Sequence, residues 1–186
     1  MGEDAEHKAW LAAVANGDRA ALGALYRALE PSVFRFLHAR LNDSFEAADL
    51  LHDVFMEVWR GAGRFEGRSK VRTWVFGIAY RKLVDAGRKR ARLTPMADVP
   101  EPDETAPDGA AALARAEEAA HVRTCLGTLS DDHRTAIDLA FYEDMTYREI
   151  AAVLGVAEGT VKTRIFHAKR LLLRCLQRVL PTKGPA

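Results

Sequence analysis

Residues 146–170 read TYREIAAVLGVAEGTVKTRIFHAKR, and their pattern predicts a helix-turn-helix. Thr146 and Glu149 have the spacing of a capping box, in which two side chains satisfy each other's backbone N–H groups at the start of a helix. This short helix ends at Gly155, because the tight turn that follows favours a residue that tolerates a positive φ. A second helix begins at about Glu158 and continues beyond residue 170, so the second helix of the motif is the first part of a long helix.

The second helix of this motif places polar side chains where DNA would meet them. Val161 and Ile165 anchor the helix to the core, so the residues around them point outward. A recognition helix presents its early turns to base edges in the major groove, where Arg and Lys pair with guanine and Thr contacts bases or thymine methyls. The ring of Phe166 could either pack in the core or flank the DNA. The candidate base-reading residues are Lys162, Thr163, Arg164, Phe166 and His167.

Charge is unevenly distributed along the chain, although 27 basic and 26 acidic residues leave a formal net charge of only +1. Residues 60–92 contain eleven Lys or Arg and two acids, and residues 160–186 contain seven Lys or Arg and no acid. An acidic stretch, residues 98–108, separates the two basic segments. Two interpretations explain this pattern equally well: the basic segments form two surfaces that bind polyanions, or they are simply solvated helix faces. Helix-turn-helix motifs also occur in protein–protein modules, but the acid-free basic helix favours DNA binding here.

Aromatic and basic residues alternate around a second predicted loop, residues 65–69, and along the helix after it. Aromatic rings offer stacking faces for unpaired bases and cations bind phosphates, so this mixture is typical of single-stranded DNA binding. A pocket in the loop could hold an unpaired base. Trp74 and Phe76 could instead be core residues, and for Trp74 taken alone the core is the better interpretation. The candidate residues for single-stranded DNA are Phe65, Arg68, Ser69, Arg72, Trp74, Arg81 and Lys82.

A third group of residues lies on the predicted helix between Asp49 and Trp59. Its apolar residues cover more surface than one small bundle needs, and its acids fall at positions i, i+4 and i+8. An acidic and apolar helix on an otherwise basic domain predicts a protein docking surface rather than a DNA surface. Metal binding by these acids is a weaker interpretation, because three acids on one helix are common. The candidate docking residues are Asp49, Leu50, Asp53, Val54, Phe55, Val58 and Trp59.

The helical period dominates the whole chain, which predicts an all-α protein of two small helical domains. The first domain comprises residues 1–92, and Pro31 predicts a kink or a break in its second helix. Residues 93–109 contain four prolines among the acids and are expected to form a flexible acidic linker. The second domain comprises residues 110–186 and ends in the helix-turn-helix. Expected helix starts are capped by Asp18, by Asp43 or Ser44, and by Ser130.

The two cysteines, Cys125 and Cys175, lie fifty residues apart and outside any spacing typical of metal sites. His121 shares a helical face with Cys125, but a metal site would need further ligands, so core packing is favoured. We therefore expect two reduced thiols buried in helices, as in a reducing cytoplasm, with no metal and no cofactor. The polar N-terminus has no apolar signal core, and no apolar run approaches the roughly 18 residues of a membrane span. A cytoplasmic protein without membrane insertion is expected.

Several motifs in a fixed order resemble the sigma-70 family, specifically the small extracytoplasmic-function (ECF) type that retains only regions 2 and 4. The resemblance covers about residues 9–92 and 113–180. Its most specific pieces are DLLHDVF at 49–55, FEGRS at 65–69, RTWVFGIA at 72–79, YREIA at 147–151 and EGTVKTR at 158–164. The resemblance implies an RNA polymerase sigma factor, which directs core polymerase to specific promoters and is not an enzyme.

The resemblance also implies a role for each group of residues. The helix of residues 49–59 would grip the clamp helices of the polymerase β′ subunit, and the loop and basic helix of the first domain would melt and hold the −10 element. The five candidate base-reading residues would read the −35 element, and the acidic linker would lie near the RNA exit path. The family further implies control by an anti-sigma factor, which could itself carry a metal. Arg68 and Arg81 depart from the residues usual in the family, so the −10 preference stays open.

Two alternatives come from other classes of protein. A sigma-like mimic would sequester an anti-sigma factor without binding DNA, and it would not need the basic residues of the last helix. A DNA-processing enzyme would need a nucleophile–base pair, a Gly-rich phosphate loop or acids with metal-ligand spacing. The sequence contains none of these patterns, which argues against an enzyme.

Overall fold

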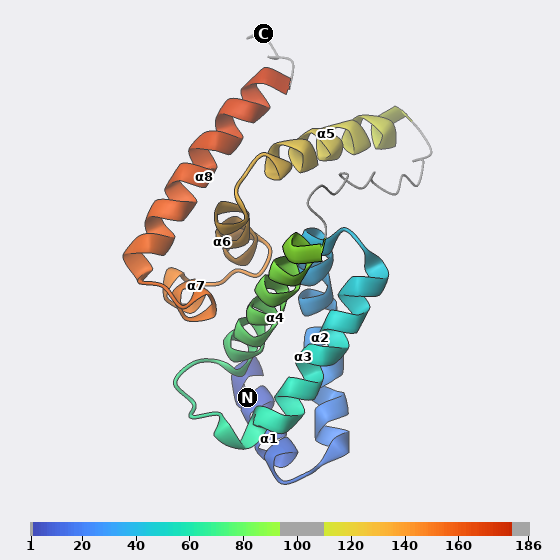
Figure 1. Cartoon of the computed structure of the whole chain (residues 1–186), viewed down its shortest axis with the longest axis vertical. Coiled ribbons are helices and arrows are strands. Elements are labelled where there is room, and N and C mark those ends of the chain that lie inside the picture. The colour runs from blue at the N-terminus through green and yellow to red at the C-terminus, as the bar shows by residue number, and fades with distance from the viewer. Residues whose placement is uncertain (1, 94–109, 180–186) are drawn as a thin grey trace. The chain divides into compact units, whose positions relative to one another are not determined.

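The computed structural model describes the backbone of residues 2–93 and 110–179 and the side chains of residues 2–90 and 119–179. The regular elements in these ranges are helical, which confirms the expected all-α fold (Figure 1). They are α1 (Glu3–Ala15), α2 (Arg19–Leu41), α3 (Ser44–Gly61), the 3-10 helix η1 (Ala62–Arg64), α4 (Val71–Leu93), α5 (Ala110–Gly127), α6 (Asp131–Phe141), α7 (Tyr147–Leu154) and α8 (Glu158–Val179).

The chain forms two compact units. The N-terminal unit contains α1–α4, and the C-terminal unit contains α5, α6, α8 and the start of α7. The predicted acidic linker, residues 93–109, lies outside the described residues except for Leu93, the last residue of α4.

Short acidic side chains start two of the helices, as the sequence predicts. The Asp18 carboxylate accepts hydrogen bonds from the N–H groups of Ala20 and Ala21 at 2.8 and 3.1 Å. Asp43, rather than Ser44, caps α3 and accepts from the first turn of that helix at 2.8 and 3.0 Å. These caps satisfy donors that have no partner within their own helix.

The sequence predicts a kink or a break at Pro31, but α2 continues without a break from Arg19 to Leu41. The Pro31 side chain is exposed, so its ring meets solvent rather than a packed neighbour. The hydroxyl of Ser32 donates to the carbonyl of Leu29 at 3.0 Å, beside the proline. Apolar residues before and after Pro31 are buried, so packing against α1 and α3 offsets the backbone hydrogen bond that proline removes.

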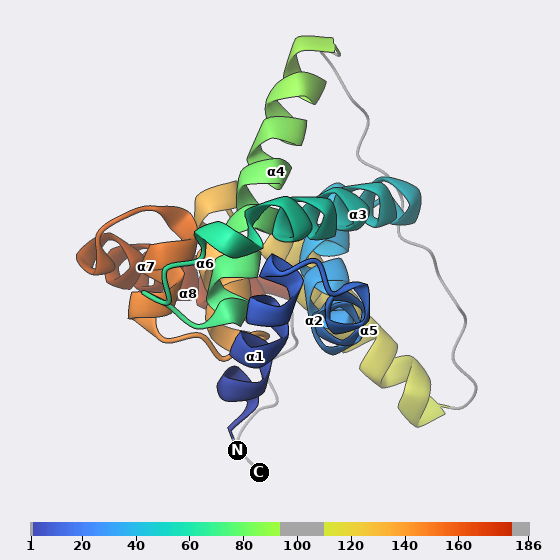
Figure 2. The same cartoon turned by 90° about the horizontal axis from the view of Figure 1, so that it is seen from below.

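Within the N-terminal unit, α3 contacts α1, α2, α4 and η1, and it lies against α2 in both views (Figure 1, Figure 2). Packing on several sides requires a wider apolar face than a helix at the edge of a bundle needs. The buried apolar side chains of α3 are those of Ala47, Leu51, Val54, Phe55 and Val58. Most of the apolar width that suggests a docking surface in the sequence is therefore core.

The first helix caps α4 across a separation of 67 residues. The Asp4 carboxylate accepts a hydrogen bond from the backbone N–H of Val71 at 3.1 Å and pairs with the Lys8 ammonium at 2.8 Å. Partial burial acts to raise the pKa of Asp4, but the hydrogen bonds from Lys8 and Val71 and the nearby positive charge outweigh it. The pKa of Asp4 therefore lies below its usual value.

We expect Asp4→Ala to lower the free energy of unfolding of the N-terminal unit by about 1 kcal/mol, because it removes a cap from α4. Since the folded pKa is depressed, the ionised carboxylate stabilises the unit above the unfolded pKa of 3.8. That contribution is lost as the pH falls through the folded pKa. Urea unfolding followed by tryptophan fluorescence measures both effects. The matched control is Glu3→Ala, which removes an exposed acid one residue away; an equal effect of the two substitutions would contradict the cap.

In the C-terminal unit, α8 packs against both α6 and α5. Cys125 of α5 and Cys175 of α8 form a disulfide, and their Cα atoms lie 5.7 Å apart. The expectation of two separate reduced thiols is therefore wrong for this structure. The reason is tertiary: α5 and α8 lie side by side, although fifty residues separate the cysteines.

Candidate DNA and protein interfaces

The capping box and the turn predicted for the helix-turn-helix are confirmed. The backbone N–H of Glu149 donates to the Thr146 hydroxyl at 3.3 Å, and the backbone N–H of Thr146 donates to the Glu149 carboxylate at 2.8 Å. Gly155, directly after α7, has a φ of +67°. The N–H of Val156 donates to the carbonyl of Ala151 at 3.2 Å, and this bond helps to set the direction in which the chain leaves α7 and approaches α8.

Three buried residues of α8 define which way its other side chains point. Val161, Ile165 and Ala168 are each at most 2% exposed. Because an α-helix turns by about 100° per residue, the opposite side of α8 carries a set of side chains that all point away from the core. The set, which we call the α8 outer face, consists of Thr163, Phe166, His167 and Arg170, all exposed.

Phe166, ambiguous in the sequence, is 57% exposed on the α8 outer face. The Arg170 guanidinium lies 5.7 Å from the centre of the Phe166 ring, and the His167 ring meets it edge-on with centroids 5.6 Å apart. The Thr163 hydroxyl donates to the carbonyl of Gly159 at 3.0 Å. Sequence reasoning does not single out Arg170, although a residue four positions after Phe166 shares its side of the helix.

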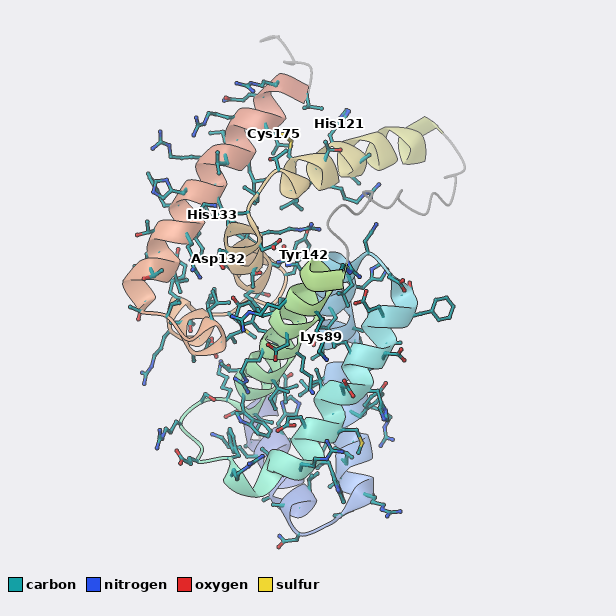
Figure 3. The ribbon with its side chains drawn as sticks, viewed as in Figure 1. Lys89, His121, Asp132, His133, Tyr142 and Cys175 are labelled. Carbon is teal, nitrogen blue, oxygen red and sulfur yellow. A yellow bond between two sulfur atoms is a disulfide. The ribbon has the colours of Figure 1, made fainter. Side chains whose placement is uncertain are left out.

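The other two candidate base-reading residues flank the α8 outer face on opposite sides. The Lys162 side chain is 58% exposed and pairs with Glu158 at 3.0 Å. The Arg164 side chain is only 21% exposed, and its guanidinium binds the Asp132 carboxylate at 2.5 Å. Asp132 lies in the first turn of α6 (Figure 3). Lys162 is therefore open to solvent, whereas Arg164 is engaged with a neighbouring helix.

In the N-terminal unit, the rings of Phe65 and Trp74 contact each other beside the loop of residues 65–69, with centroids 5.4 Å apart. The indole also covers Gly61, where an added Cβ would lie 3.4 and 3.6 Å from two of its ring carbons. Both aromatic side chains are half-buried, so each packs on the unit and leaves part of its surface accessible. Phe76 is fully buried, as its core interpretation predicts.

Basic side chains flank this aromatic pair along the loop and α4. Gly67 has a φ of +71° in the loop, and the exposed Arg68 beside it pairs with Glu66 at 2.5 Å. The Arg72 guanidinium lies 5.1 Å from the centre of the buried Phe76 ring. The other candidates for single-stranded DNA are at least partly exposed: Ser69, Arg81 and Lys82. All seven candidates thus retain some exposed surface.

The exposed side of α3 carries four residues that we call the α3 outer face: Phe45, Asp49, His52 and Asp53. Phe45 is 88% exposed, an uncommon position for a large aromatic side chain. Phe45 and His52 are absent from the docking residues inferred from sequence, although each is one turn from Asp49, four residues before it and three residues after it.

The candidate docking residues divide between surface and core. Leu50 and Trp59 are half-buried. Val54, Phe55 and Val58 are at most 4% exposed, and the Phe55 ring contacts Tyr26 of α2 with centroids 4.6 Å apart. Those three side chains hold the N-terminal unit together and present no surface to a partner.

The three acids spaced along α3 do not form a metal site. Glu57 pairs with Arg64 at 3.6 Å, while Asp49 and Asp53 are exposed. No group of three or more His, Cys, Asp or Glu side chains within the described ranges is arranged to hold a metal ion. Of the helices that the structure describes, none combines the length and the apolarity needed to cross a bilayer.

Two protein families match the chain, one in each unit. The family described as Sigma-70 region 2 matches residues 25–93, and the family described as Sigma-70, region 4 matches residues 120–172. The ECF RNA polymerase sigma factor RpoE of Cereibacter sphaeroides is 34% identical over 80% of this chain and 82% of that protein. The ECF RNA polymerase sigma factor SigK of Mycobacterium tuberculosis is 32% identical over 90% of this chain and 92% of that protein.

Two solved structures share the fold of this chain. CnrH, in complex with the cytosolic domain of CnrY, has a TM-score of 0.70 and 24% identity, over 93% of this chain and 98% of that one. The sigma factor RpoE from Bartonella quintana, in complex with the anti-sigma factor NepR, has a TM-score of 0.66 and 25% identity. That comparison covers 82% of this chain and 94% of the other.

Proposed function

This chain belongs to the sigma-70 family, as an RNA polymerase sigma factor of the ECF type, and we propose how its parts direct core polymerase to promoters. Residues 1–92 form the domain that binds polymerase and the −10 element, and residues 110–186 form the domain that reads the −35 element. The order of the two family matches, region 2 before region 4, supports this division.

The α8 outer face carries the proposal for the −35 element. Its exposed side chains follow a turn with a positive-φ glycine, and three of the four, Thr163, Phe166 and His167, lie in the first half of a long helix. From that position a helix can enter the major groove and bring a hydroxyl, a ring and cations to base edges. The residues proposed to meet DNA are Lys162, Thr163, Phe166, His167 and Arg170.

The aromatic pair and its basic neighbours support a site for the unpaired strand of the −10 element. The half-buried rings of Phe65 and Trp74 offer faces on which bases can stack, and the surrounding cations can bind phosphates. The cations and the hydroxyl proposed for this site belong to Arg68, Ser69, Arg72, Arg81 and Lys82. Melted DNA would be held here while polymerase begins transcription.

The α3 outer face, with Leu50 and Trp59 beside it, is the proposed docking surface for the β′ clamp helices of polymerase. Its two acids would meet basic residues of that partner, and Phe45 would supply an aromatic anchor. We further propose that the protein works in the cytoplasm, has no catalytic activity of its own and is held inactive by an anti-sigma factor. One of the similar structures is a complex of this kind, between the sigma factor RpoE and the anti-sigma factor NepR of Bartonella quintana.

Run-off transcription with core polymerase, this protein and a library of genomic promoter fragments tests the function directly. We expect transcripts that start downstream of a shared pair of −35 and −10 sequences and that require the protein. A protein that bound an anti-sigma factor but gave no transcript from any fragment would instead be a sigma-like mimic.

We expect Phe65→Ala to reduce formation of the open promoter complex roughly five- to 150-fold, because base stacking on an aromatic ring contributes about 1–3 kcal/mol. Permanganate reactivity of unpaired thymines in the −10 element measures the melted fraction. Phe65→Tyr keeps a stacking ring and is the matched control, and it should retain melting. Equal melting by the alanine and tyrosine variants would remove Phe65 from the site.

A further inference from the structure

Arg164 occupies a different side of α8 from the residues of the outer face. It lies between Val161 and Ile165 in the sequence, and the helical turn of about 100° per residue places it at the edge of the buried side. Its side chain is 21% exposed, compared with 58% for the neighbouring Lys162. A long cationic side chain at a helix edge normally buries its stem and keeps its charged head in water, so an exposure as low as 21% indicates a partner for the guanidinium.

That partner is the first turn of α6. The Arg164 guanidinium and the Asp132 carboxylate are 2.5 Å apart, although the two residues are 32 positions apart in the chain. A second pair lies beside the first: the rings of His133 in α6 and His167 in α8 have centroids 6.4 Å apart. His133 directly follows Asp132, and both are labelled in Figure 3. The Ser130 hydroxyl, which caps α6, lies 3.1 Å from Nδ1 of His133. Two adjacent side chains of α6 thus touch two side chains one turn apart on α8.

The ion pair restricts what Arg164 can do in DNA recognition. Specific recognition of guanine by arginine uses two guanidinium N–H groups at once and needs the guanidinium to reach the base edge. The ion pair engages Nη2 of Arg164 and holds the guanidinium against α6, so the pair opposes that contact. Releasing Arg164 would also leave Asp132 without its cation near the helix that approaches the phosphates, where a bare carboxylate would repel DNA. An intact ion pair keeps the Arg164 guanidinium bound and keeps the Asp132 carboxylate neutralised while DNA is bound.

We propose that Arg164 is a positioning residue, which acts through Asp132 to hold α8 on α6 so that the α8 outer face meets the base edges. Base preference then comes from Thr163, Phe166 and His167, and not from Arg164. This inference rests on the proposed −35 function, and it changes which residue of the motif should alter sequence preference.

The test measures the affinity of the full chain, assembled with core polymerase, for promoter duplexes that carry every single-base change in the −35 element, at fixed salt. Arg164→Ala and Asp132→Ala should each weaken binding to all duplexes by the same factor, roughly three- to fivefold, the size expected for an ion pair. The charge exchange, Asp132→Arg with Arg164→Asp, should restore much of that loss. The matched control, Thr163→Ala, should change the preference at one or two positions.

Two results would overturn the inference. One is a relaxed preference at a single −35 position in Arg164→Ala, with unchanged binding in Asp132→Ala, as expected of a base-reading arginine. The other is a charge exchange that binds no better than the single variants. A wild-type holoenzyme that ignored every −35 change would instead contradict the proposed function. Even in that case the ion pair can be tested on its own. Urea unfolding of the C-terminal unit gives the free energy of unfolding for Arg164→Ala, for Asp132→Ala and for the double variant, and non-additive losses measure the energy of the pair.

Discussion

Reduction of the Cys125–Cys175 disulfide is expected to lower the free energy of unfolding of the C-terminal unit by about 4 kcal/mol. The bond closes a loop between residues fifty positions apart, and a cross-link of that span removes about this much conformational freedom from the unfolded chain. The bond joins α5 to α8, so its reduction should lower the local stability first where those two helices pack together. The α8 outer face depends on the same helix for its placement.

Hydrogen exchange at peptide resolution, with and without dithiothreitol across a urea series, measures this loss separately in each unit. Peptides from α5, α6 and α8 should lose protection at a lower urea concentration after reduction. The N-terminal unit is an internal control, because both cysteines lie in the C-terminal unit and all three tryptophans lie in the N-terminal one. Its tryptophan fluorescence transition should stay unchanged. Equal urea midpoints for α8 in the two redox states would show that the bond adds nothing to stability.

The sequence could not predict this disulfide because the spacing of cysteines says nothing about which helices lie side by side. The expectation of reduced thiols rested on the usual state of cytosolic cysteines. The packing of α8 on α5 brings Cys125 and Cys175 within bonding distance, and that packing is a property of the whole unit.

Local features were predictable for the opposite reason. The capping box of Thr146 and Glu149, the positive φ of Gly155 and the cap at Asp18 each involve residues within a few positions of one another. The chemistry of those residues decides such contacts whatever the rest of the chain does. The contacts that escaped prediction join distant segments, as Asp4 joins Val71 and Arg164 joins Asp132.

The interpretation of α3 shows where an apolar pattern alone is insufficient. A wide apolar face predicts that a helix is buried on several sides. It does not indicate whether the residues that pack against that face belong to the same chain or to a partner protein. Here α1, α2, α4 and η1 provide the cover, so Phe55 and Val58 belong to the core. The acids at Asp49 and Asp53 are a better guide to the exposed side, because ionised carboxylates are rarely buried without a partner.

Replacing both Asp49 and Asp53 by lysine is expected to weaken binding to core RNA polymerase by about 2–4 kcal/mol, or roughly 30- to 1,000-fold. Both carboxylates are exposed on the α3 outer face, so their reversal should leave the core intact. At an interface with basic residues, each reversal removes an attraction and introduces a repulsion. Phe45→Ala should weaken binding as well. The Phe45 ring is 88% exposed in the free protein and would be buried against polymerase, so the substitution removes that contact area from the interface.

The control for this experiment must change the charge equally without touching α3. Glu3→Lys with Glu6→Lys does so, because both acids are exposed on α1 of the same unit. Fluorescence anisotropy with labelled core polymerase gives the affinity of each variant, and tryptophan fluorescence confirms that the unit stays folded. Phe55→Ala is unsuitable, since Phe55 is 4% exposed and its loss would damage the core. If the α1 and α3 reversals weakened binding by the same factor, net charge rather than the α3 outer face would govern docking.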